Sequence, residues 1–358
     1  GAAVVMDPNT GEVLALVSIP TYDNNIWAES KIRSAELEAL ANDSTTYALT
    51  NKALSSAAPG STFKIVTSSA GLEEGNINAG TSFYVGCNLE VKGVNNEIYT
   101  YKDWRCHNMT MDVRTALAWS SNVFMFLTAG GDLTATRGLG KDIEESGAIL
   151  ATWARRFGYG KTTGIDLYGE DPGRIPDPGW KKRTYVGPGF NAGDSEWLLG
   201  DNYNTAIGQG DVLATPLQVA RMTAAIANGG KLVTPHIVNE VISPEGKTVR
   251  TIEPEFQDVG LSESTIRVIR EGMLGSVAYG AGELAQIPNA SVAGKTGTAE
   301  FYDQKSDRWT QHAWFTGFAP YDNPEVVVTV YFDIGIGGTH AAPVAGKILE
   351  YYFENVKR

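Results

Sequence analysis

The sequence predicts an α/β (α+β) fold, in which helices cover both faces of a mostly antiparallel sheet. Three observations lead to this prediction. The first 18 residues alternate like two strands around a Pro-Asn-Thr-Gly turn, the middle of the chain carries helical patterns, and three strand candidates follow near the C-terminus. Because unpaired strand edges are unfavourable, we expect the N-terminal hairpin to pair with the C-terminal strands.

The individual elements are expected in the following order. A helix at 62–73 ends at Gly75, and an irregular or short-strand, loop-rich insertion occupies 80–110. Val113, Leu117 and Ser120-Ser121 then lie at near-helical spacing, which predicts a helix there. Glycine, proline and aspartate are frequent from 159 to 211, which predicts loops that shape a groove. The remaining helices are expected at 151–158, 215–230, 262–277 and 341–356, and the C-terminal strands at 290–301, 312–320 and 325–334.

Composition limits the classes of partner. The 358 residues carry a formal net charge of −12 and no dense basic block, which argues against a nucleic-acid partner. No apolar run is long enough to span a bilayer, and no signal segment opens the chain. Because the chain opens directly in a hairpin, we expect one domain over 1–358 whose natural N-terminal part lies outside this sequence.

The two cysteines leave three alternatives open. Cys87 and Cys106 lie 19 positions apart, so they form a disulfide in an oxidising compartment, stay free, or bind zinc together with Asp103 and His107. The spacing matches no standard zinc finger. Apart from this zinc alternative, we predict no bound metal and no cofactor.

The stretch "APGSTFK" contains a serine and a lysine three positions apart, Ser61 and Lys64. Pro59-Gly60-Ser61 is typical of a turn that leads into a helix, where serine is common. Three residues are nearly one helical turn, so both side chains lie on one face and the lysine amine is placed to take the serine proton. This Ser-x-x-Lys pair alone is a weak signal, because it arises by chance about once in a chain of this length.

Two further motifs strengthen the interpretation. "WSSNVF" supplies Ser120 and Asn122, and "AGKTGTAEF" supplies Lys295, Thr296, Gly297 and Thr298 on a predicted strand. Each of the three patterns occurs once, and their order is that of the penicillin-recognising serine enzymes.

The resemblance covers essentially the whole chain. "VVMDPNTGEVLALVSIPTYD", "FGYGKTTGIDL", "AIGQGDVLATPLQVARMTAAIANGG" and "HAWFTGFAP" are similar to the transpeptidase domain of class B penicillin-binding proteins. "YKDWRCH", the "RIPDPGWKK" loop and the start of the chain resemble the elongation-type penicillin-binding protein 2 most. The resemblance implies the penicillin-recognising serine transpeptidase fold, which is β-lactamase-like.

The resemblance also implies a role for each motif residue. Ser61 is the nucleophile, Lys64 removes its proton once burial and the neighbouring cation Lys295 lower the lysine pKa, and Ser120 relays protons to the leaving amine. Asn122 holds Lys64 and contacts the substrate amide. Lys295, Thr296 and Thr298 bind the substrate carboxylate, Gly297 permits close backbone approach, and the N–H groups of Ser61 and Thr298 form the oxyanion hole.

The implied activity is that of a D,D-transpeptidase that cross-links peptidoglycan stem peptides and is acylated by β-lactam antibiotics. The implied location is the extracytoplasmic face of the bacterial cytoplasmic membrane, beside a membrane glycosyltransferase of the cell-elongation machinery. The resemblance also implies an N-terminal membrane anchor and a non-catalytic region outside this sequence. Two rivals stay open: a class D type serine β-lactamase and a non-catalytic β-lactam sensor domain. Some relatives bind a metal near the segment from Cys87 to His107, but Ser121 here replaces a cysteine that would be a ligand.

Overall fold

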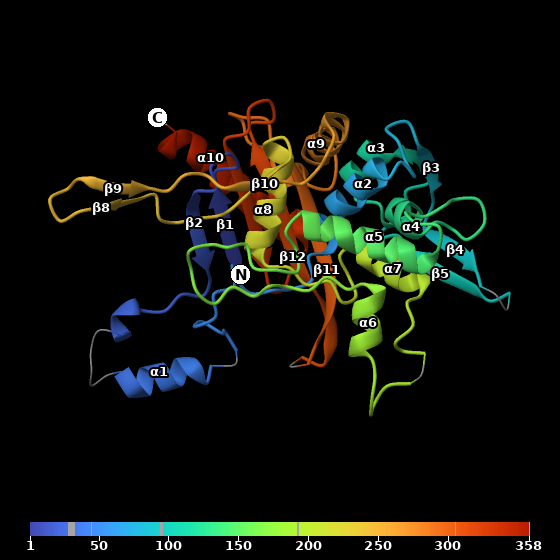
Figure 1. Cartoon of the computed structure of the whole chain (residues 1–358), viewed down its shortest axis with the longest axis horizontal. Coiled ribbons are helices and arrows are strands. Elements are labelled where there is room, and N and C mark those ends of the chain that lie inside the picture. Colours follow the sequence, from blue (N-terminus) through green and yellow to red (C-terminus); the bar gives the residue numbers. More distant parts are fainter. Residues whose placement is uncertain (28–32, 44, 94–95, 192, 305, 358) are drawn as a thin grey trace.

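The computed structural model describes residues 1–27, 33–43, 45–93, 96–191, 193–304 and 306–357. Its central sheet has five antiparallel strands in the order β11-β12-β13-β1-β2 (Figure 1). The N-terminal hairpin therefore pairs with the C-terminal strands through β1 and β13, as the sequence predicts. The strands are β1 (Ala2–Met6), β2 (Val13–Ser18), β11 (Ala293–Asp303), β12 (Arg308–Ala319) and β13 (Val326–Phe332).

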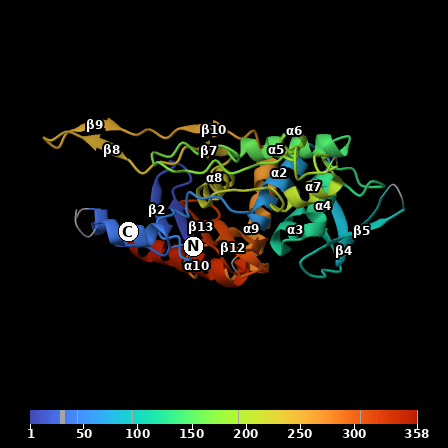
Figure 2. The same ribbon diagram turned by 90° about the horizontal axis from the view of Figure 1, so that it is seen from below.

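Helices cover both faces of this sheet, which confirms the predicted fold class. Alternate side chains of a strand point to opposite faces, so Val4 and Val5 enter different cores. Val4 belongs to the core that contains α8 (Pro216–Ala227), whereas Val5 packs in the core that contains α10 (Ala342–Tyr351). Figure 2, seen from below, has α8 on one side of the strands and α10 on the other.

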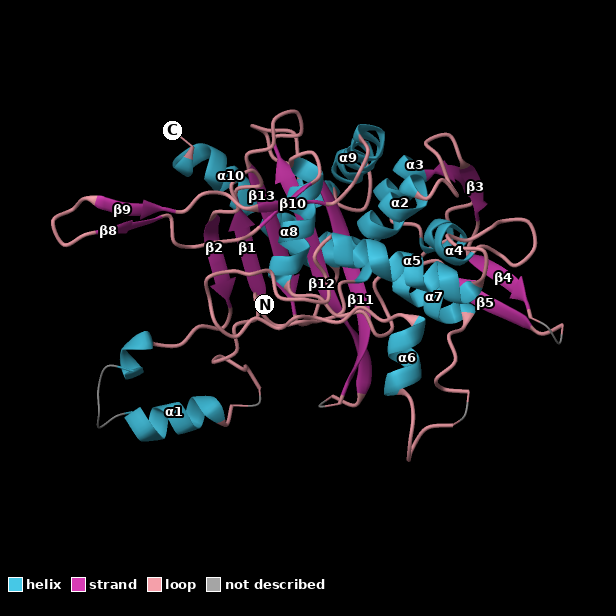
Figure 3. Cartoon of the chain, viewed as in Figure 1, coloured by secondary structure: helices cyan, strands magenta, loops and turns pink. Residues whose placement is uncertain are grey.

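A group of helices packs beside the edge strand β11 (Figure 3). Its centre is α2, in which eight of ten residues are buried, so this helix is covered all round. The 3₁₀ turn η2 leads directly into α2. The helices of this group are η2 (Gly60–Phe63), α2 (Lys64–Glu73), α3 (Val113–Trp119), α4 (Asn122–Gly130), α5 (Ile143–Arg156), α7 (Leu199–Ala206) and α9 (Glu263–Ala278).

The sequence predicts helix through Ser120-Ser121. This prediction is wrong, because the helix breaks there into α3 and α4. Ser120 takes the left-handed conformation, with φ +58°, which ends α3. Ser121 then starts α4, since its Oγ accepts a hydrogen bond from Phe124 N at 3.2 Å.

Two further expectations need correction. The helix expected at 151–158 starts earlier, at Ile143, because Asp142 caps it by accepting a hydrogen bond from Glu145 N at 2.8 Å. The segment 159–211, expected to be loops, contains α7 and a further helix, α6 (Pro178–Thr184). Asp177 caps α6. The first residue of this helix is Pro178, and proline is favoured at the first position of a helix.

The insertion at 80–110 holds two small antiparallel pairs, β3–β6 and β4–β5, and a separate hairpin, β8–β9, projects from the body (Figure 1). Among the described residues, no helix combines the length and the apolar character needed to cross a membrane. The remaining elements are η1 (Asn24–Trp27), α1 (Arg33–Ala41), β3 (Ser82–Val85), β4 (Asn88–Lys92), β5 (Ile98–Lys102), β6 (Met109–Asp112), β7 (Lys231–Val233), β8 (Glu240–Ile242), β9 (Thr248–Thr251), β10 (Phe256–Asp258), η3 (Glu283–Ala285), η4 (Gly337–Ala341) and η5 (Tyr352–Val356).

Candidate active site

Ser61 lies in η2, where the chain before α2 meets the edge strand β11. Two glycines make this contact close. A Cβ on Gly60, which has φ +54°, would lie 2.6 Å from the carbonyl oxygen of Thr298, and a Cβ on Gly297 would lie 2.7 Å from that of Pro59. Only glycine leaves room for both backbones. The backbone next to Ser61 thus adjoins the backbone of Thr298, as the expected oxyanion hole requires.

A tryptophan from the sheet holds the same segment in place. The indole Nε1 of Trp314 on β12 donates a hydrogen bond to the carbonyl oxygen of Ala58 at 2.9 Å. Trp314 is fully buried, so its indole N–H has no contact with solvent and needs this partner. The hydroxyl of Thr62 adds a bond to Pro59 O at 2.9 Å. The turn that carries Ser61 is therefore fixed both to the sheet and to itself.

Lys64 begins α2, three residues after Ser61, and its side chain is fully buried. Its Nζ donates hydrogen bonds to the carbonyl oxygen of Ser120 at 2.6 Å and to Asn122 Oδ1 at 2.6 Å, and lies 3.3 Å from Ser120 Oγ. Burial lowers the pKa of Lys64 from 10.5 to about 7, against an opposing effect of Asp103. At neutral pH the amine is therefore neutral part of the time and able to accept a proton.

The break between α3 and α4 places Ser120 between two lysines. Besides its contact with Lys64, the hydroxyl of Ser120 accepts a hydrogen bond from Lys295 Nζ at 2.8 Å. Lys295 lies on β11 and is also fully buried. Burial, together with the charge of Lys64, lowers the pKa of Lys295 well below its usual value. Of the two causes expected to lower the pKa of Lys64, burial has this effect, whereas Lys295 is not among the groups that shift it.

The rest of the Lys-Thr-Gly motif follows along β11, whose outer edge is unpaired within the five-stranded sheet. Thr296 accepts a hydrogen bond from Lys295 Nζ through its carbonyl oxygen at 3.1 Å. The hydroxyl of Thr298 accepts one from Gly337 N at 3.2 Å. The structure therefore gathers Ser120, Asn122 and the two lysines, and it aligns the Lys-Thr-Gly strand with the turn that carries Ser61.

The cysteines form a disulfide, Cys87–Cys106. Because neither sulfur is then a thiolate, neither is available as a zinc ligand. Asp103 and His107 lie near each other, with 3.6 Å between Asp103 Oδ1 and His107 Nε2, but two donors do not make a zinc site. In the described part of the chain, no group of three or more His, Cys, Asp or Glu side chains is placed to hold a metal. The residues present do not fit zinc.

Asp103 has a different position, which the sequence reasoning missed. Its buried carboxylate accepts hydrogen bonds from Ser121 Oγ at 2.8 Å, from Asn122 N at 3.0 Å and from Val123 N at 3.1 Å. It therefore joins the 80–110 segment to the first turn of α4. The sequence offered no signal for this contact beyond the polar character of the residue, because 18 positions separate Asp103 from Ser121.

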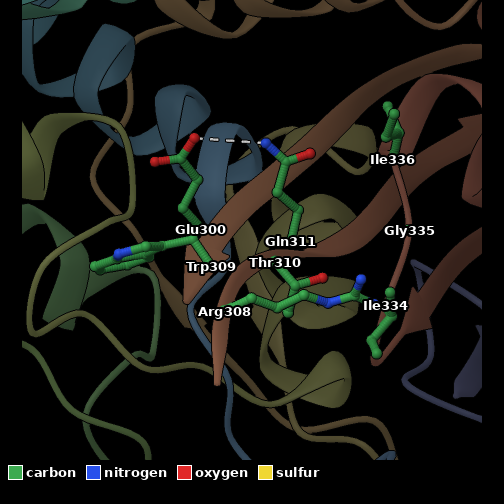
Figure 4. A pocket seen from close by; sticks show the side chains of 8 residues that line it. All are labelled: Glu300, Arg308, Trp309, Thr310, Gln311, Ile334, Gly335 and Ile336. Carbon is green, nitrogen blue, oxygen red and sulfur yellow. Dashed lines mark hydrogen bonds between the residues drawn. The ribbon is translucent and has the colours of Figure 1, made fainter. Parts of the chain in front are cut away.

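A cavity of about 460 Å³ lies along β11 and β12, beyond the Lys-Thr-Gly motif (Figure 4). Glu300 on β11 and Gln311 on β12 form a hydrogen bond at the wall of the cavity. Ile336, in the segment before η4, also lines it. Gly337, next to Ile336, donates to Thr298, so the cavity borders the Lys-Thr-Gly motif. The other lining residues are Arg308, Trp309, Thr310, Ile334 and Gly335.

Comparison with known proteins agrees with this geometry. Residues 1–350 match the family described as the penicillin binding protein transpeptidase domain. The chain belongs to this family. The peptidoglycan D,D-transpeptidase MrdA of Haemophilus influenzae is 33% identical over 371 residues, which cover 98% of the chain and 52% of MrdA. The chain thus spans about half the length of the curated relatives it matches.

Solved structures of penicillin-binding proteins have the same fold. The PBP2 of Pseudomonas aeruginosa in complex with WCK 5153 has a TM-score of 0.81 at 28% identity, covering 99% of the chain and 71% of that protein. Penicillin-binding protein A of M. tuberculosis, solved as a ceftriaxone acyl-enzyme, has a TM-score of 0.76 at 28% identity and coverage of 98% and 73%. The complex of PBP2 with MreC from Helicobacter pylori has a TM-score of 0.77 at 28% identity, with coverage of 99% and 60%.

Proposed function

We propose that this domain is a peptidoglycan D,D-transpeptidase that acts through an acyl-serine intermediate. The observation that carries the proposal is the buried Lys64, one helical turn from Ser61, with its pKa lowered to about 7. A serine hydroxyl is a weak nucleophile and needs a base close by. Lys64 supplies that base without a metal or an organic cofactor.

In the proposed reaction, Ser61 Oγ attacks the carbonyl carbon of the penultimate D-alanine of a stem peptide, and its proton passes to Lys64. The tetrahedral intermediate then collapses, the C–N bond breaks, and the terminal D-alanine leaves as an amine. Ser120 accepts hydrogen bonds from both lysines, which supports a role in passing the proton to this leaving nitrogen. An amine of a second stem peptide then attacks the acyl-serine and restores the enzyme.

The Lys-Thr-Gly strand is the proposed binding site for the substrate carboxylate. Lys295, Thr296 and Thr298 are proposed to bind the terminal carboxylate of the stem peptide, with Gly297 allowing the strand to lie close to the turn before Ser61. The N–H groups of Ser61 and Thr298 are proposed to stabilise the oxyanion. Asn122, held 2.6 Å from Lys64 Nζ, is proposed to fix that amine and to contact the substrate amide.

β-Lactams are proposed to acylate the same serine, because they resemble the terminal D-alanyl-D-alanine. The acyl-enzyme of the M. tuberculosis relative supports this step. The complex of the H. pylori relative with MreC supports an assembly of the cell-elongation type. We accordingly propose that the protein acts on the extracytoplasmic face of the cytoplasmic membrane, beside a membrane glycosyltransferase. An internal disulfide fits an oxidising compartment.

The function is tested with a stem pentapeptide that ends in D-alanyl-D-alanine and with an amine acceptor. We expect release of D-alanine and a cross-linked product, both measured by mass spectrometry and both lost in Ser61→Ala. Absence of both products in the wild-type chain, despite stable acylation by penicillin, would favour a non-catalytic sensor. Rapid turnover of penicillin would instead favour a serine β-lactamase.

A further inference from the structure

The carboxylate of Asp103 belongs to no catalytic motif, yet it contacts the segment that carries one. Its Oδ2 accepts hydrogen bonds from Ser121 Oγ and Val123 N, and its Oδ1 accepts one from Asn122 N and another from Trp104 N at 2.8 Å. The side chain of Asp103 is fully buried. An anion at the N-terminus of a helix satisfies backbone N–H groups that have no partner within the helix.

The helix that Asp103 caps begins with Asn122. The side-chain oxygen of Asn122 accepts a hydrogen bond from Lys64 Nζ at 2.6 Å, and Ser120, on the other side of the break, accepts two more from the same amine. Displacement of the first turn of α4 would therefore move the groups that hold the proposed base.

The segment that presents Asp103 is itself cross-linked. Asp103 N donates to the carbonyl oxygen of Cys87 at 2.9 Å, and His107 N donates to that of Gly86 at 3.2 Å. The disulfide between Cys87 and Cys106 joins the same two segments covalently. Asp103 is therefore held on a covalently closed loop, which limits how far its carboxylate moves from α4.

The charge of Asp103 also affects the pKa of Lys64. The charged or titratable groups that face Lys64 are Lys295 on β11, and Asp103 and His107 on the 80–110 segment. Asp103 raises the pKa of Lys64, whereas burial lowers it. Burial also lowers the pKa of His107, which favours its uncharged form, so Asp103 is the negative group among these neighbours.

We propose that Asp103 is a positioning residue of the acylation site: its carboxylate fixes the first turn of α4, and thereby Asn122, against Lys64, and its charge offsets part of the burial cost of the lysine ammonium. This proposal rests on the proposed function, because it assigns Asp103 a task in the acylation of Ser61. Asp103 touches neither the nucleophile nor the substrate, and it acts only through Asn122, Ser121 and Lys64.

The two parts of this role are separable by two variants. Asp103→Asn removes the charge and keeps one acceptor oxygen, but its NH2 group then faces a backbone N–H, so the acidic limb of the acylation rate shifts below pH 7 and the maximal rate falls less than in Asp103→Ala. Asp103→Ala removes every acceptor and releases α4, so the maximal acylation rate falls by about 10–100-fold. In Asp103→Ala the half-saturating penicillin concentration changes less than the rate constant, because the carboxylate-binding strand is untouched.

Asp142→Asn is the matched control. Asp142 is the exposed N-cap residue of α5, whose carboxylate accepts a hydrogen bond from Glu145 N at 2.8 Å, and none of the proposed catalytic or substrate-binding residues lies on α5. This variant makes the same chemical change at a helix start, and we expect neither the acidic limb nor the maximal rate to move. Thermal unfolding of all three variants, followed by circular dichroism, shows which of them are folded.

The experiment measures benzylpenicillin acylation of the 358-residue chain by intact mass, from about pH 5 to about pH 9. A downward shift of the acidic limb in Asp103→Asn, absent from Asp142→Asn, supports the proposal. An acidic limb in Asp103→Asn that coincides with that of wild type overturns the charge part of the proposal, and this variant is informative even where Asp103→Ala does not fold. A folded Asp103→Ala with the maximal rate of wild type overturns the positioning part. Failure of the wild-type chain to be acylated overturns the proposed function, and this inference with it, before any variant is compared.

Discussion

Lys64 and Lys295 share one hydroxyl: Ser120 Oγ lies 3.3 Å from the first amine and 2.8 Å from the second. Two buried ammonium groups this close would repel each other, and burial alone already disfavours their charged forms. Burial lowers the pKa of both lysines, and the charge of Lys64 lowers that of Lys295 further. The hydroxyl of Ser120 therefore connects the proposed lysine base to the proposed carboxylate-binding strand.

The lowered pKa of Lys64 predicts a specific pH dependence of acylation. The neutral amine is the reactive form, so the rate should rise with pH through about 7 and then level off. At one pH unit below that midpoint, we expect about one tenth of the maximal rate. Stopped reactions with benzylpenicillin, analysed by intact mass at a series of pH values, measure this. An acidic limb near 10.5, the usual pKa of lysine, would contradict the assignment of Lys64 as the base.

Gly60 should be irreplaceable for steric reasons. Both Gly60 and Gly75 have positive φ, but a Cβ would meet Thr298 O at 2.6 Å in the first case and nothing within 4 Å in the second. We expect Gly75→Ala to cost about 1–2 kcal/mol, the strain of alanine in the left-handed region. Gly60→Ala should cost more, about 3–4 kcal/mol, because Thr298 must also move.

The same pair of glycine variants separates stability from activity. Gly60→Ala should lower the acylation rate by about 100-fold, because it pushes the turn that carries Ser61 away from β11. Gly75→Ala should leave this rate unchanged. Urea unfolding and acylation rates measure the two effects. Equal stabilities and equal rates for the two variants would refute the close contact between Gly60 and Thr298.

The disulfide should stabilise the 80–110 segment. Replacing Cys87 and Cys106 by serine opens a loop of 19 residues, and we expect the free energy of unfolding to fall by about 2–4 kcal/mol. Urea unfolding of the double variant against wild type, with thiol labelling to establish that wild type has no free cysteine, provides the measurement. Two titratable thiols in the native wild-type chain would show that the bond is not formed.

Much of this architecture is predictable from the sequence. The pairing of the N-terminal hairpin with the last strands follows from the need to cover strand edges. The start of α8 is visible as Thr215, Pro216 and Gln218, which form a capping box with proline in the first turn. The three motifs also name the side chains that the fold gathers, because their order and contexts are more specific than any of them alone.

Other features depend on contacts that a linear pattern does not carry. The flanks of Ser120 both favour helix, so the break that brings its hydroxyl to two lysines has no local signal. Asp103 caps α4 from a different segment, and only the folded chain reveals this partner. Helix α7 buries one face, which includes Leu199, Tyr203 and Ala206, but its eight residues are too few for this periodicity to stand out in a segment rich in glycine and aspartate.

The most direct test of the account is a time course of the adduct that benzylpenicillin forms with Ser61, followed by intact mass and located by peptide mapping, with Ser61→Ala as the control. We predict a stoichiometric adduct on Ser61 that persists for many minutes and is absent from Ser61→Ala. An adduct on another residue, or none in the folded wild-type chain, would contradict the assignment of Ser61 as the nucleophile.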